Sequence, residues 1–557
     1  MRATTGGKLR GGTAGRRDAN QREGGADAIN DGALHIPAGP LADGFFVNPI
    51  GEGADPCVVR DGERYLWCQS EGNLGVAVWV SDRLTSLGTK HVVWTAPAEG
   101  ACSRQVWAPE LSYLDGRWHV YFAASDGDNA SHLTYVLVAD TGDPLGPYSL
   151  HGPLGTGQSS GVDSENLWSI DLTVLEHSRR RYAVWSGWPT VGRDEQHLYI
   201  AAMRSPVELA GPRVRLCAND DYDWERTEED PSSRGLHEAP QALTRDGRTF
   251  LVYSCAASWL PTYKMGMLEL VGDEPLDPQS WRKQERPIFQ SAGSTYGVGH
   301  GSVVSSLDDS QWWHVFHAKR DPHVGWRRVL HVQPMRFDGG EPLFDTPAAV
   351  GQPLRMPAAS PTASKDAALS WRFSESESID DFDYYGHHQF YDVGADGLQL
   401  GRVPARPVND FRSGEKVVLR DGRYDDLRLT TTFSFVDPRR GAGLVFRVTG
   451  ASVGFDAQRG YYAGLAPDRR CLVLGMMDGR AWTELATAPV STDLAGELTL
   501  VVEAAGPSIT IRLDSAPDEA LHHLDATYPH GSIGLRVVDA HTRFRTLAVE
   551  PLPHRAR

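Results

Sequence analysis

Residues 237–253 read HEAPQALTRDGRTFLVY: a polar lead residue, a short apolar run, a polar turn and an aromatic strand. The same order returns four more times in the first two-thirds of the chain. The other copies are ADPCVVRDGERYLW (54–67), APELSYLDGRWHVYF (108–122), IDLTVLEHSRRRYAVW (170–185) and GHGSVVSSLDDSQWWHVF (299–316). Short strands that recur with a period of this size are typical of a β-propeller, in which each repeat forms one blade. The sequence therefore predicts a five-bladed β-propeller.

One acidic residue or histidine leads each copy of the repeat. These lead residues are Asp55, Glu110, Asp171, Glu238 and His300, at successive intervals of 55, 61, 67 and 62 residues. Because the innermost strands of a propeller converge on its axis, we expect these side chains to converge on one pocket. Asp61, Asp115 and Asp246 also lie in the repeats, but each precedes a glycine and is interpreted as a hairpin-turn residue.

Three of the lead residues have chemistry that suits hydrolysis of a glycosidic bond. That reaction needs one carboxylic acid to protonate the leaving oxygen and a second carboxylate to activate water or to attack directly. The two groups need different pKa values, and neighbouring like charges separate the pKa values of carboxyls. A single Asp at a strand start is more often a turn or cap residue. The shared position in three repeats is what makes Asp55, Asp171 and Glu238 candidate catalytic residues.

Bulk composition excludes several classes of partner. The 557-residue chain has a formal net charge of −17, which argues against nucleic acid and against anionic membrane surfaces as partners. It contains no run of 18 apolar residues, so no transmembrane helix is expected. Its six cysteines show no CxxC and no zinc-like spacing, and Cys57, Cys68 and Cys255 fall in predicted strands as buried thiols. An oligosaccharide or polysaccharide stays open as the partner.

The chain divides into four segments by composition. Residues 1–40 form a low-complexity leader without the apolar region of a secretory signal, so a cytoplasmic location is expected. Residues 43–350 hold the repeats, and residues 351–370, rich in Pro, Ala and Ser, are interpreted as a linker. Residues 371–557 contain seven strand candidates at the spacing of a jelly-roll β-sandwich, with a texture similar to concanavalin-like or laminin G-like sandwiches. The fold class is therefore all-β, and the sandwich either binds sugar or supports the propeller.

Five short motifs resemble those of glycoside hydrolase family 43. The motifs are GADP (53–56), WAPEL (107–111), SID (169–171), HEAPQ (237–241) and YGVGHGS (296–302), and the resemblance covers residues 43–350. It implies a five-bladed propeller enzyme that inverts the anomeric carbon and needs no organic cofactor. It assigns Asp55 as general base, Glu238 as general acid, and Asp171 as the carboxylate that tunes the pKa of the acid and orients it.

The resemblance also implies roles for other residues around the pocket. Trp107 would form part of the pocket wall, and Arg328 would reach the substrate or take part in an ion pair. His300 would contact substrate and lie near a structural calcium or sodium ion, directly or through water, or else be a hydrogen-bonded core histidine. Glu110 is interpreted as structural. Two positions depart from the family pattern: Ala239 stands where Gly is usual, and Gly301 stands where Asn is usual.

The substrate prediction rests on a sixth stretch. YSCAASWLPTYKMGMLEL (253–270) resembles the arabinofuranosidase branch of the family, which implies an exo-acting α-L-arabinofuranosidase that releases terminal furanose residues from plant-type or similar glycans. A β-xylosidase or a β-galactofuranosidase would use the same three carboxylates. A non-catalytic sugar-binding propeller and an assembly scaffold are the alternatives outside catalysis. Retention of all three carboxylates argues against both.

Overall fold

The computed structural model describes residues 39–157, 166–227, 235–362, 366–387, 390–401 and 414–553. These ranges are built almost entirely of β-strands, which confirms the all-β prediction. The helices are short 3-10 turns: η1 (Asn129–Ser131), η2 (Asp223–Glu225), η3 (Pro278–Ser280) and η4 (Ser376–Ile379). Within the described ranges, no helix has the length and apolar character needed to cross a bilayer. The predicted leader lies almost wholly outside the described residues.

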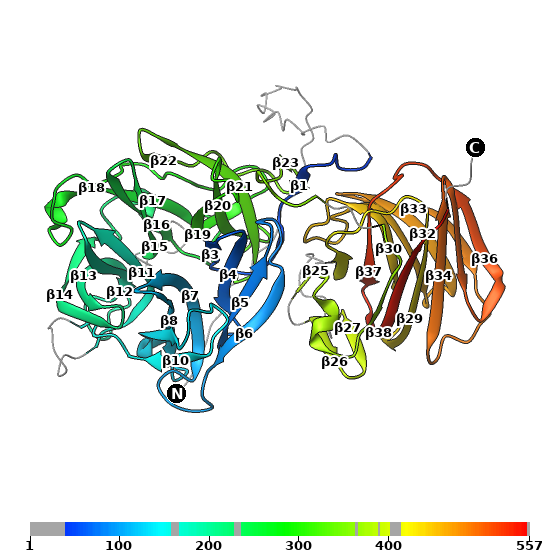
Figure 1. Ribbon diagram of the computed structural model, residues 1–557, viewed down its shortest axis with the longest axis horizontal. Helices are drawn as coiled ribbons and strands as arrows, with labels where there is room; N and C mark the ends of the chain where they lie inside the picture. Colours follow the sequence, from blue (N-terminus) through cyan, green and yellow to red (C-terminus); the bar gives the residue numbers. More distant parts are fainter. Residues whose placement is uncertain are drawn as a thin grey trace, which may run out of the picture. The chain divides into compact units, whose positions relative to one another are not determined.

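Five sheets of consecutive antiparallel strands form the first part of the chain (Figure 1). In four of them the strands are β3 (Cys57–Asp61), β4 (Arg64–Ser70), β5 (Gly75–Ser81) and β6 (Thr89–Thr95); β7 (Arg104–Leu114), β8 (Arg117–Ser125), β9 (Leu133–Ala139) and β10 (Tyr148–His151); β11 (Ser169–His177), β12 (Arg180–Gly187), β13 (His197–Ser205) and β14 (Glu208–Cys217); β15 (Leu236–Arg245), β16 (Arg248–Ala256), β17 (Lys264–Leu270) and β18 (Trp281–Lys283). The last sheet contains β19 (Tyr296–Ser305), β20 (Trp312–Lys319), β21 (Arg328–Asp338) and β22 (Glu341–Leu343).

The sheets close into a ring. Each first strand contacts the first strand of the next sheet, and β19 contacts β3. The last sheet is completed by an N-terminal strand, because β2 (Gly51–Glu52) pairs with β21 through Gly51 and Leu330. A second N-terminal strand, β1 (Phe45–Val47), pairs with β23 (Pro353–Arg355). The five-bladed propeller prediction is confirmed, and both ends of the repeat region take part in its closure.

The Asp-Gly pairs act as hairpin turns. Leu114 pairs with Arg117 around Asp115 (φ 50°) and Gly116 (φ 79°), and Asp246 and Gly247 have φ values of 51° and 77°. A two-residue turn with positive φ at both central residues matches the right-handed twist of the strands, and Asp-Gly favours it. At the first blade the turn lies one residue later than predicted, because Asp61 itself pairs with Arg64.

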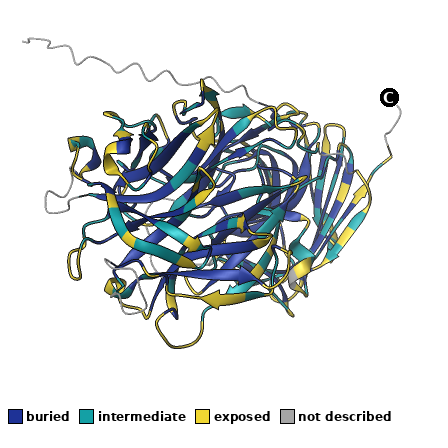
Figure 2. Cartoon of the chain, turned by 60° about the vertical axis from the view of Figure 1, so that its left-hand side comes forward, coloured by how far each residue is buried: buried dark blue, intermediate teal, exposed yellow. Residues whose placement is uncertain are grey.

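Apolar faces of neighbouring blades pack against each other. Buried residues follow the strands while exposed residues gather in the connecting loops (Figure 2). One buried cluster joins the first two blades through Cys57, Leu66, Val78, Val120 and Leu137. All six cysteines are buried free thiols, and among them are Cys57, Cys68 and Cys255, for which burial was predicted. The blades therefore hold one another in register, and the residues at the front of each inner strand are placed on a rigid frame.

The C-terminal region forms two further antiparallel sheets. One contains β24 (Leu369–Arg372), β26 (Tyr391–Gly394), β27 (Gly397–Leu400), β29 (Leu427–Asp437), β34 (Leu498–Ala505), β35 (Ser508–Leu513), β36 (Ala516–Leu524) and β38 (His541–Pro551). The other contains β25 (Phe382–Tyr385), β28 (Lys416–Leu419), β30 (Gly441–Thr449), β31 (Arg459–Ala466), β32 (Cys471–Asp478), β33 (Trp482–Pro489) and β37 (Ser532–Val538).

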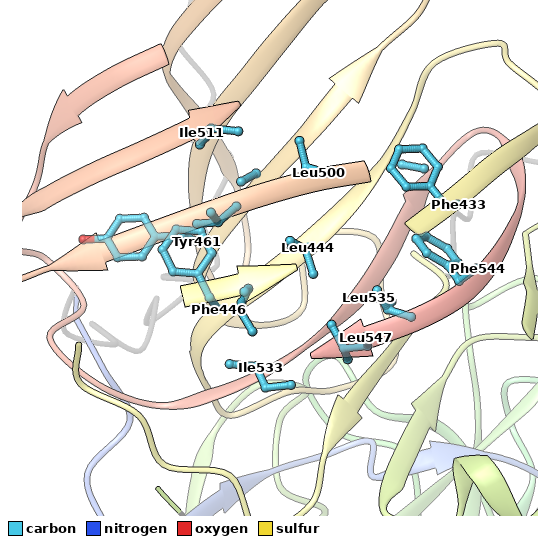
Figure 3. Packing of buried hydrophobic residues seen from close by; sticks show 14 of the residues in the cluster. Phe433, Leu444, Phe446, Tyr461, Leu500, Ile511, Ile533, Leu535, Phe544 and Leu547 are labelled. Atoms are coloured by element: carbon cyan, nitrogen blue, oxygen red, sulfur yellow. The ribbon is translucent and has the colours of Figure 1, made fainter. Parts of the chain in front are cut away.

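The two sheets share one apolar core. Alternate residues of both sheets, among them Phe433, Leu444, Leu500, Ile533 and Phe544, are fully buried between them (Figure 3). Period-two alternation of this kind is what a sandwich requires. The seven strands predicted here are all present, as β29, β30, β31, β32, β34, β35 and β37. The domain boundaries at residues 351–370 stay a prediction.

Candidate active site

The inner strands are bent by bulges at the positions of the lead residues. Asp55, Asp171 and His300 have left-handed backbone conformations, with φ of 51°, 56° and 42°, and so does Ala239, directly after Glu238, with φ of 54°. The strand register shifts at the same points in β11, β15 and β19. Such a conformation costs a residue other than Gly about 1–3 kcal/mol, and bulges beside active sites re-aim side chains.

Asp55 lies just before β3 and is held by three basic side chains. Its Oδ1 accepts a hydrogen bond from Arg328 Nη1 at 2.8 Å and lies 3.1 Å from His300 Nδ1. The Nδ1 atom of His317 lies 3.1 Å from both the backbone nitrogen and the Oδ1 atom of Asp55. Burial raises the pKa of Asp55, but the charges of Arg328 and His300 outweigh it and hold this pKa well below its ordinary value. Asp55 is therefore ionised, and its side chain is 19% exposed.

Glu238 lies in β15 and has the opposite character. The side chain is buried, and its Oε1 accepts a hydrogen bond of 2.6 Å from the Tyr263 hydroxyl. Burial, with the charge of Asp171 as the second cause, raises the pKa of Glu238 to about 7, although the Tyr263 hydrogen bond opposes the change. Glu238 therefore carries a proton at acidic to neutral pH. That is the state a general acid needs.

Asp171 connects the acid to the rest of the cluster. Its Oδ2 accepts a hydrogen bond of 3.0 Å from the backbone N–H of Ala239, the residue after Glu238, and lies 4.0 Å from His300 Nδ1. Burial raises the pKa of Asp171, and the charge of Asp55 adds to the effect while that of His300 opposes it. Asp171 thus fixes the backbone at Glu238 and places a second carboxyl beside it.

His300 lies between these carboxyls. Its backbone N–H donates to Ser254 Oγ at 2.8 Å, which fixes the start of β19 against β16. Burial lowers the pKa of His300, but the charges of Asp55 and Asp171 outweigh it and raise this pKa to about 10. The imidazole is therefore protonated, and its buried Nε2 has no hydrogen-bond partner among the described protein groups.

A direct bond from His300 to a metal ion would require the imidazole to lose a proton. Both ring nitrogens of an imidazolium are donors, whereas a metal ligand must offer a lone pair. Among the described residues, no group of three or more His, Cys, Asp or Glu side chains is arranged to hold a metal ion. A contact of His300 to a cation, directly or through water, stays a prediction.

Stacked aromatic side chains form a wall on the second and third blades. The Trp107 ring stacks on His132 with centroids 3.9 Å apart, and the ring of Trp168 stacks on Trp188 at 5.0 Å. His132 is fixed by contacts of 2.9 and 3.2 Å from its ring nitrogens to backbone oxygens. Glu110 is half-buried near this wall, and burial raises its pKa to about 7. Trp107 therefore belongs to a larger aromatic group.

Two open cavities lie elsewhere on the described part of the molecule. One of about 460 Å³ is lined by residues such as Arg245, Trp312 and Met356, and one of about 390 Å³ lies in the sandwich between residues such as Tyr462 and Trp482. Neither is lined by any of the clustered carboxyls. The buried cluster with opposite pKa displacements is a stronger indication of chemistry than an open hollow without such groups.

Known proteins give an independent comparison. The model of glycosyl hydrolases family 43 matches residues 46–342, just over half of the chain. The chain belongs to glycosyl hydrolase family 43. It is 32% identical over 291 residues to alpha-L-arabinofuranosidase 43 of Humicola insolens, a match that covers 50% of this chain and 57% of that protein. The chain thus spans little more than half of this curated relative.

Two further relatives are each similar to about half of this chain. An extracellular exo-alpha-(1->5)-L-arabinofuranosidase of Streptomyces chartreusis is 30% identical over 285 residues, which are 49% of this chain and 83% of that protein. A crystal structure of an alpha-L-arabinofuranosidase from Lactobacillus brevis is 29% identical, with a TM-score of 0.49, and covers 55% of this chain and 98% of that one.

The five lead residues predicted from the repeats come together, but several of their partners were not predicted. Tyr263 contacts Glu238, His317 contacts Asp55, and Ser254 contacts His300. These three partners do not occupy the lead position of any repeat, so the repeat pattern did not indicate them. One family 43 motif does contain a signal for Tyr263. A Cβ on Gly299 would lie 2.6 Å from the Tyr263 ring, so the glycine in YGVGHGS leaves room for that ring. Arg328 contacts Asp55, the ion-pair alternative of its two predicted roles.

Proposed function

We propose that the chain is an inverting glycosidase that releases terminal α-L-arabinofuranosyl residues from oligosaccharides or polysaccharides. Asp55 serves as general base, Glu238 as general acid, and Asp171 as the residue that tunes and orients the acid. Trp107, His300 and Arg328 contribute to substrate binding around these groups.

One observation carries the proposal. Two carboxyls of one buried cluster have pKa values displaced in opposite directions, Asp55 downward and Glu238 upward. Pairs of titratable groups separated in this way by their surroundings mark the acid and the base of general acid–base chemistry. A sugar-binding protein would need the hydrogen bonds of these groups but not the difference in their protonation.

The reaction follows from these protonation states. Asp55 takes a proton from a water molecule, and the oxygen of that water bonds to the anomeric carbon from one face of the sugar. Glu238 gives its proton to the glycosidic oxygen as the bond from the anomeric carbon to that oxygen breaks on the other face. The products are the free sugar with inverted configuration and the shortened glycan, and an inverting pair needs room for the water between its carboxyls.

The sugar assignment is supported by the printed activities of the relatives. The relatives from Humicola insolens and Streptomyces chartreusis are both named arabinofuranosidases. The S. chartreusis protein is named for exo action on an α-(1→5) linkage. We extend that activity to this chain because the family match and the carboxyl cluster occupy the same residues.

A panel of p-nitrophenyl glycosides tests the proposal. The substrates are the α-L-arabinofuranoside, β-D-xyloside, β-D-galactofuranoside and α-L-arabinopyranoside, and Asp55→Asn is the blank. We expect hydrolysis of the α-L-arabinofuranoside that the variant lacks. Hydrolysis of only the xyloside or only the galactofuranoside would change the sugar assigned to the substrate and leave the proposed mechanism unchanged. Equal rates for the wild type and Asp55→Asn would overturn the mechanism.

The predicted cation has a separate test. A calcium ion that stabilises the propeller through a water on His300 would raise the Tm, because it binds the folded chain only. We expect EDTA to lower the Tm and added calcium to restore it. A Tm and an activity that both stay constant through these treatments would contradict the prediction for calcium.

A further inference from the structure

Two tryptophans lie next to each other on separate loops of the propeller. Trp259 is in the loop between β16 and β17, and Trp326 is in the loop between β20 and β21. Their ring centroids are 5.4 Å apart, with an angle of 52° between the ring planes. Trp259 is half-buried, whereas Trp326 is 63% exposed. An indole group that stays exposed against a second indole group offers an apolar surface without a partner from the described chain.

Each tryptophan lies close in sequence to a residue that contacts one of the two proposed catalytic carboxyls. The loop of Trp259 contains Tyr263, which donates a hydrogen bond to Glu238. Arg328 follows Trp326 by two residues, and its guanidinium carbon lies 5.8 Å from the centroid of the Trp326 ring. The same guanidinium donates to Asp55 at 2.8 Å. The aromatic pair is therefore one side chain away from the reacting groups.

The two loops are fixed to each other by Lys319. Its ammonium group donates to the backbone oxygen of Trp259 at 2.8 Å and to that of Gly325, while the N–H of Gly325 donates to the oxygen of Trp259 at 2.9 Å. Lys319 is buried, and a Cβ on Gly297 would lie 2.6 Å from its side chain, so only glycine leaves it this space. The tryptophans are thus held in place before any ligand arrives, which reduces the entropy cost of binding.

We propose that Trp259 and Trp326 form the binding site for the sugar residue on the leaving-group side of the scissile bond. The proposal rests on the proposed function. The sugar that is released must lie within the carboxyl cluster, between Asp55 and Glu238, whereas the aromatic pair lies on loops and Trp326 is exposed. An indole face packs against the apolar C–H face of a sugar ring, and aromatic side chains bury a large area with few freely rotating bonds.

The chemical class of the ligand follows from the same features. The two indole rings are apolar, and the guanidinium that faces the Trp326 ring, that of Arg328, is already bound to Asp55. The carboxylate of the same loop, Asp321, is paired with His323. A neutral pentose residue of an arabinan or arabinoxylan chain matches this surface. The site therefore selects a glycan on the leaving side over a small alcohol.

Kinetics with two leaving groups test the proposal. The substrates are an arabinotriose, which places a sugar on the aromatic pair, and methyl α-L-arabinofuranoside, which does not. For Trp326→Ala we expect kcat/KM to fall about tenfold on the trisaccharide and by less than twofold on the methyl glycoside. Val324→Ala is the matched control, because Val324 is 70% exposed on the same loop. Trp326→Phe is expected to keep most of the trisaccharide activity.

Each other outcome counts against the proposal. An equal loss of kcat/KM on both substrates would show that Trp326 has a structural role. An unchanged kcat/KM on both substrates would show that Trp326 does not bind substrate. A loss in Val324→Ala as large as that in Trp326→Ala would assign the effect to the loop. If the wild type hydrolyses neither arabinofuranoside, the proposed function fails, and the leaving-side site fails with it.

Discussion

Asp55 and Glu238 differ in pKa because their neighbours differ, not because one is an aspartate and the other a glutamate. Asp55 is surrounded by cations, with Arg328 and His300 within 3.1 Å of its Oδ1. Glu238 is buried, next to another carboxyl and a tyrosine. A charged neighbour stabilises the carboxylate, whereas burial and a like charge stabilise the neutral acid. At the scale of single residues, the neighbours of each carboxyl therefore set which of the two is the proposed base and which the proposed acid.

These protonation states predict the pH dependence of the rate. Asp55 must be ionised, so kcat/KM should rise with pH through its low pKa, below the ordinary value of about 3.9 for Asp. Glu238 must be protonated, so kcat/KM should fall as the pH passes about 7. Tyr263→Phe removes the hydrogen bond that lowers the pKa of Glu238, and the falling limb should then move to higher pH. A falling limb that stays fixed in this variant would disprove the assignment of Glu238.

The sequence could predict the carboxyls but not their environment. Asp55, Asp171 and Glu238 repeat at one position of successive blades, and a repeat is visible in a single chain. Tyr263 and His317 reach the same cluster from a loop and from a second strand. Their roles depend on contacts between segments distant in sequence, which no local pattern encodes.

At the scale of elements, the bulges of the inner strands were not predicted. Alternation of apolar and polar residues indicates a strand, and the Asp-Gly pairs indicate where the strands turn. A bulge leaves that pattern almost unchanged, because it inserts one residue and then the ladder resumes. As a consequence, the left-handed backbone conformations of Asp171 and Ala239 could not be predicted from the sequence pattern. Alanine is tolerated at position 239 although the conformation favours glycine, the residue that the family pattern has there.

The close approach of β19 and β20 explains the second departure from the family pattern and predicts a mutational effect. A Cβ on Gly301 would lie 1.9 Å from the backbone oxygen of Val315, so Gly301→Asn forces the two strands apart. We expect it to lower the free energy of unfolding by more than about 4 kcal/mol, the range of exceptional substitutions.

Gly293→Asn is the matched control for this prediction. Gly293 has φ of 55°, a Cβ added there would meet no atom within 4 Å, and Asn is well represented in that conformation. Denaturant unfolding of both variants gives the comparison. A Gly301→Asn variant as stable as the Gly293→Asn variant would show that β19 and β20 do not pack this closely.

At the scale of the whole molecule, the last blade makes the fold sensitive to acid. His314, His317 and His331 are buried there, and burial lowers the pKa of each to about 3. An unfolded histidine has a pKa near 6.5. The contribution of these side chains to the free energy of unfolding is therefore complete above pH 6.5 and is lost as the pH falls toward 3. The loss is about 1.4 kcal/mol for each residue and each pH unit.

We expect the three histidines to lower the Tm between pH 6.5 and pH 4, while the raised pKa values of Glu110, Asp171 and Glu238 act in the opposite direction. His314 packs against Phe289, Phe316 and Phe344, so His314→Phe keeps the packing and removes one titrating group. Its Tm should depend less on pH than that of the wild type over this range. An identical pH dependence in both proteins would show that His314 does not titrate on unfolding.

Ring closure limited what the sequence could predict at this scale. The repeats predicted five blades, but each repeat carries no information on how the first and last blades join. The strands that close the ring pair Gly51 with Leu330 and Phe46 with Leu354. Short strands of this kind have weak patterns of their own, and loop closure over such separations is a property of the whole chain. Seven sandwich strands were predicted from their apolar residues. The short strands β26 and β27 were missed, and so were the longer strands β33, β36 and β38, which are rich in polar or charged residues.

The central claim is that Asp55 is the base and Glu238 the acid, and their response to the leaving group tests it most directly. The measurement is kcat/KM of Glu238→Gln and Asp55→Asn on an arabino-oligosaccharide and on an arabinofuranoside with a 2,4-dinitrophenyl leaving group, which needs no proton. We predict that Glu238→Gln lowers kcat/KM roughly 100-fold or more on the oligosaccharide and far less on the activated substrate. We predict that Asp55→Asn loses activity on both substrates. Equal losses of Glu238→Gln on the two substrates, or wild-type rates in either variant, would contradict the account.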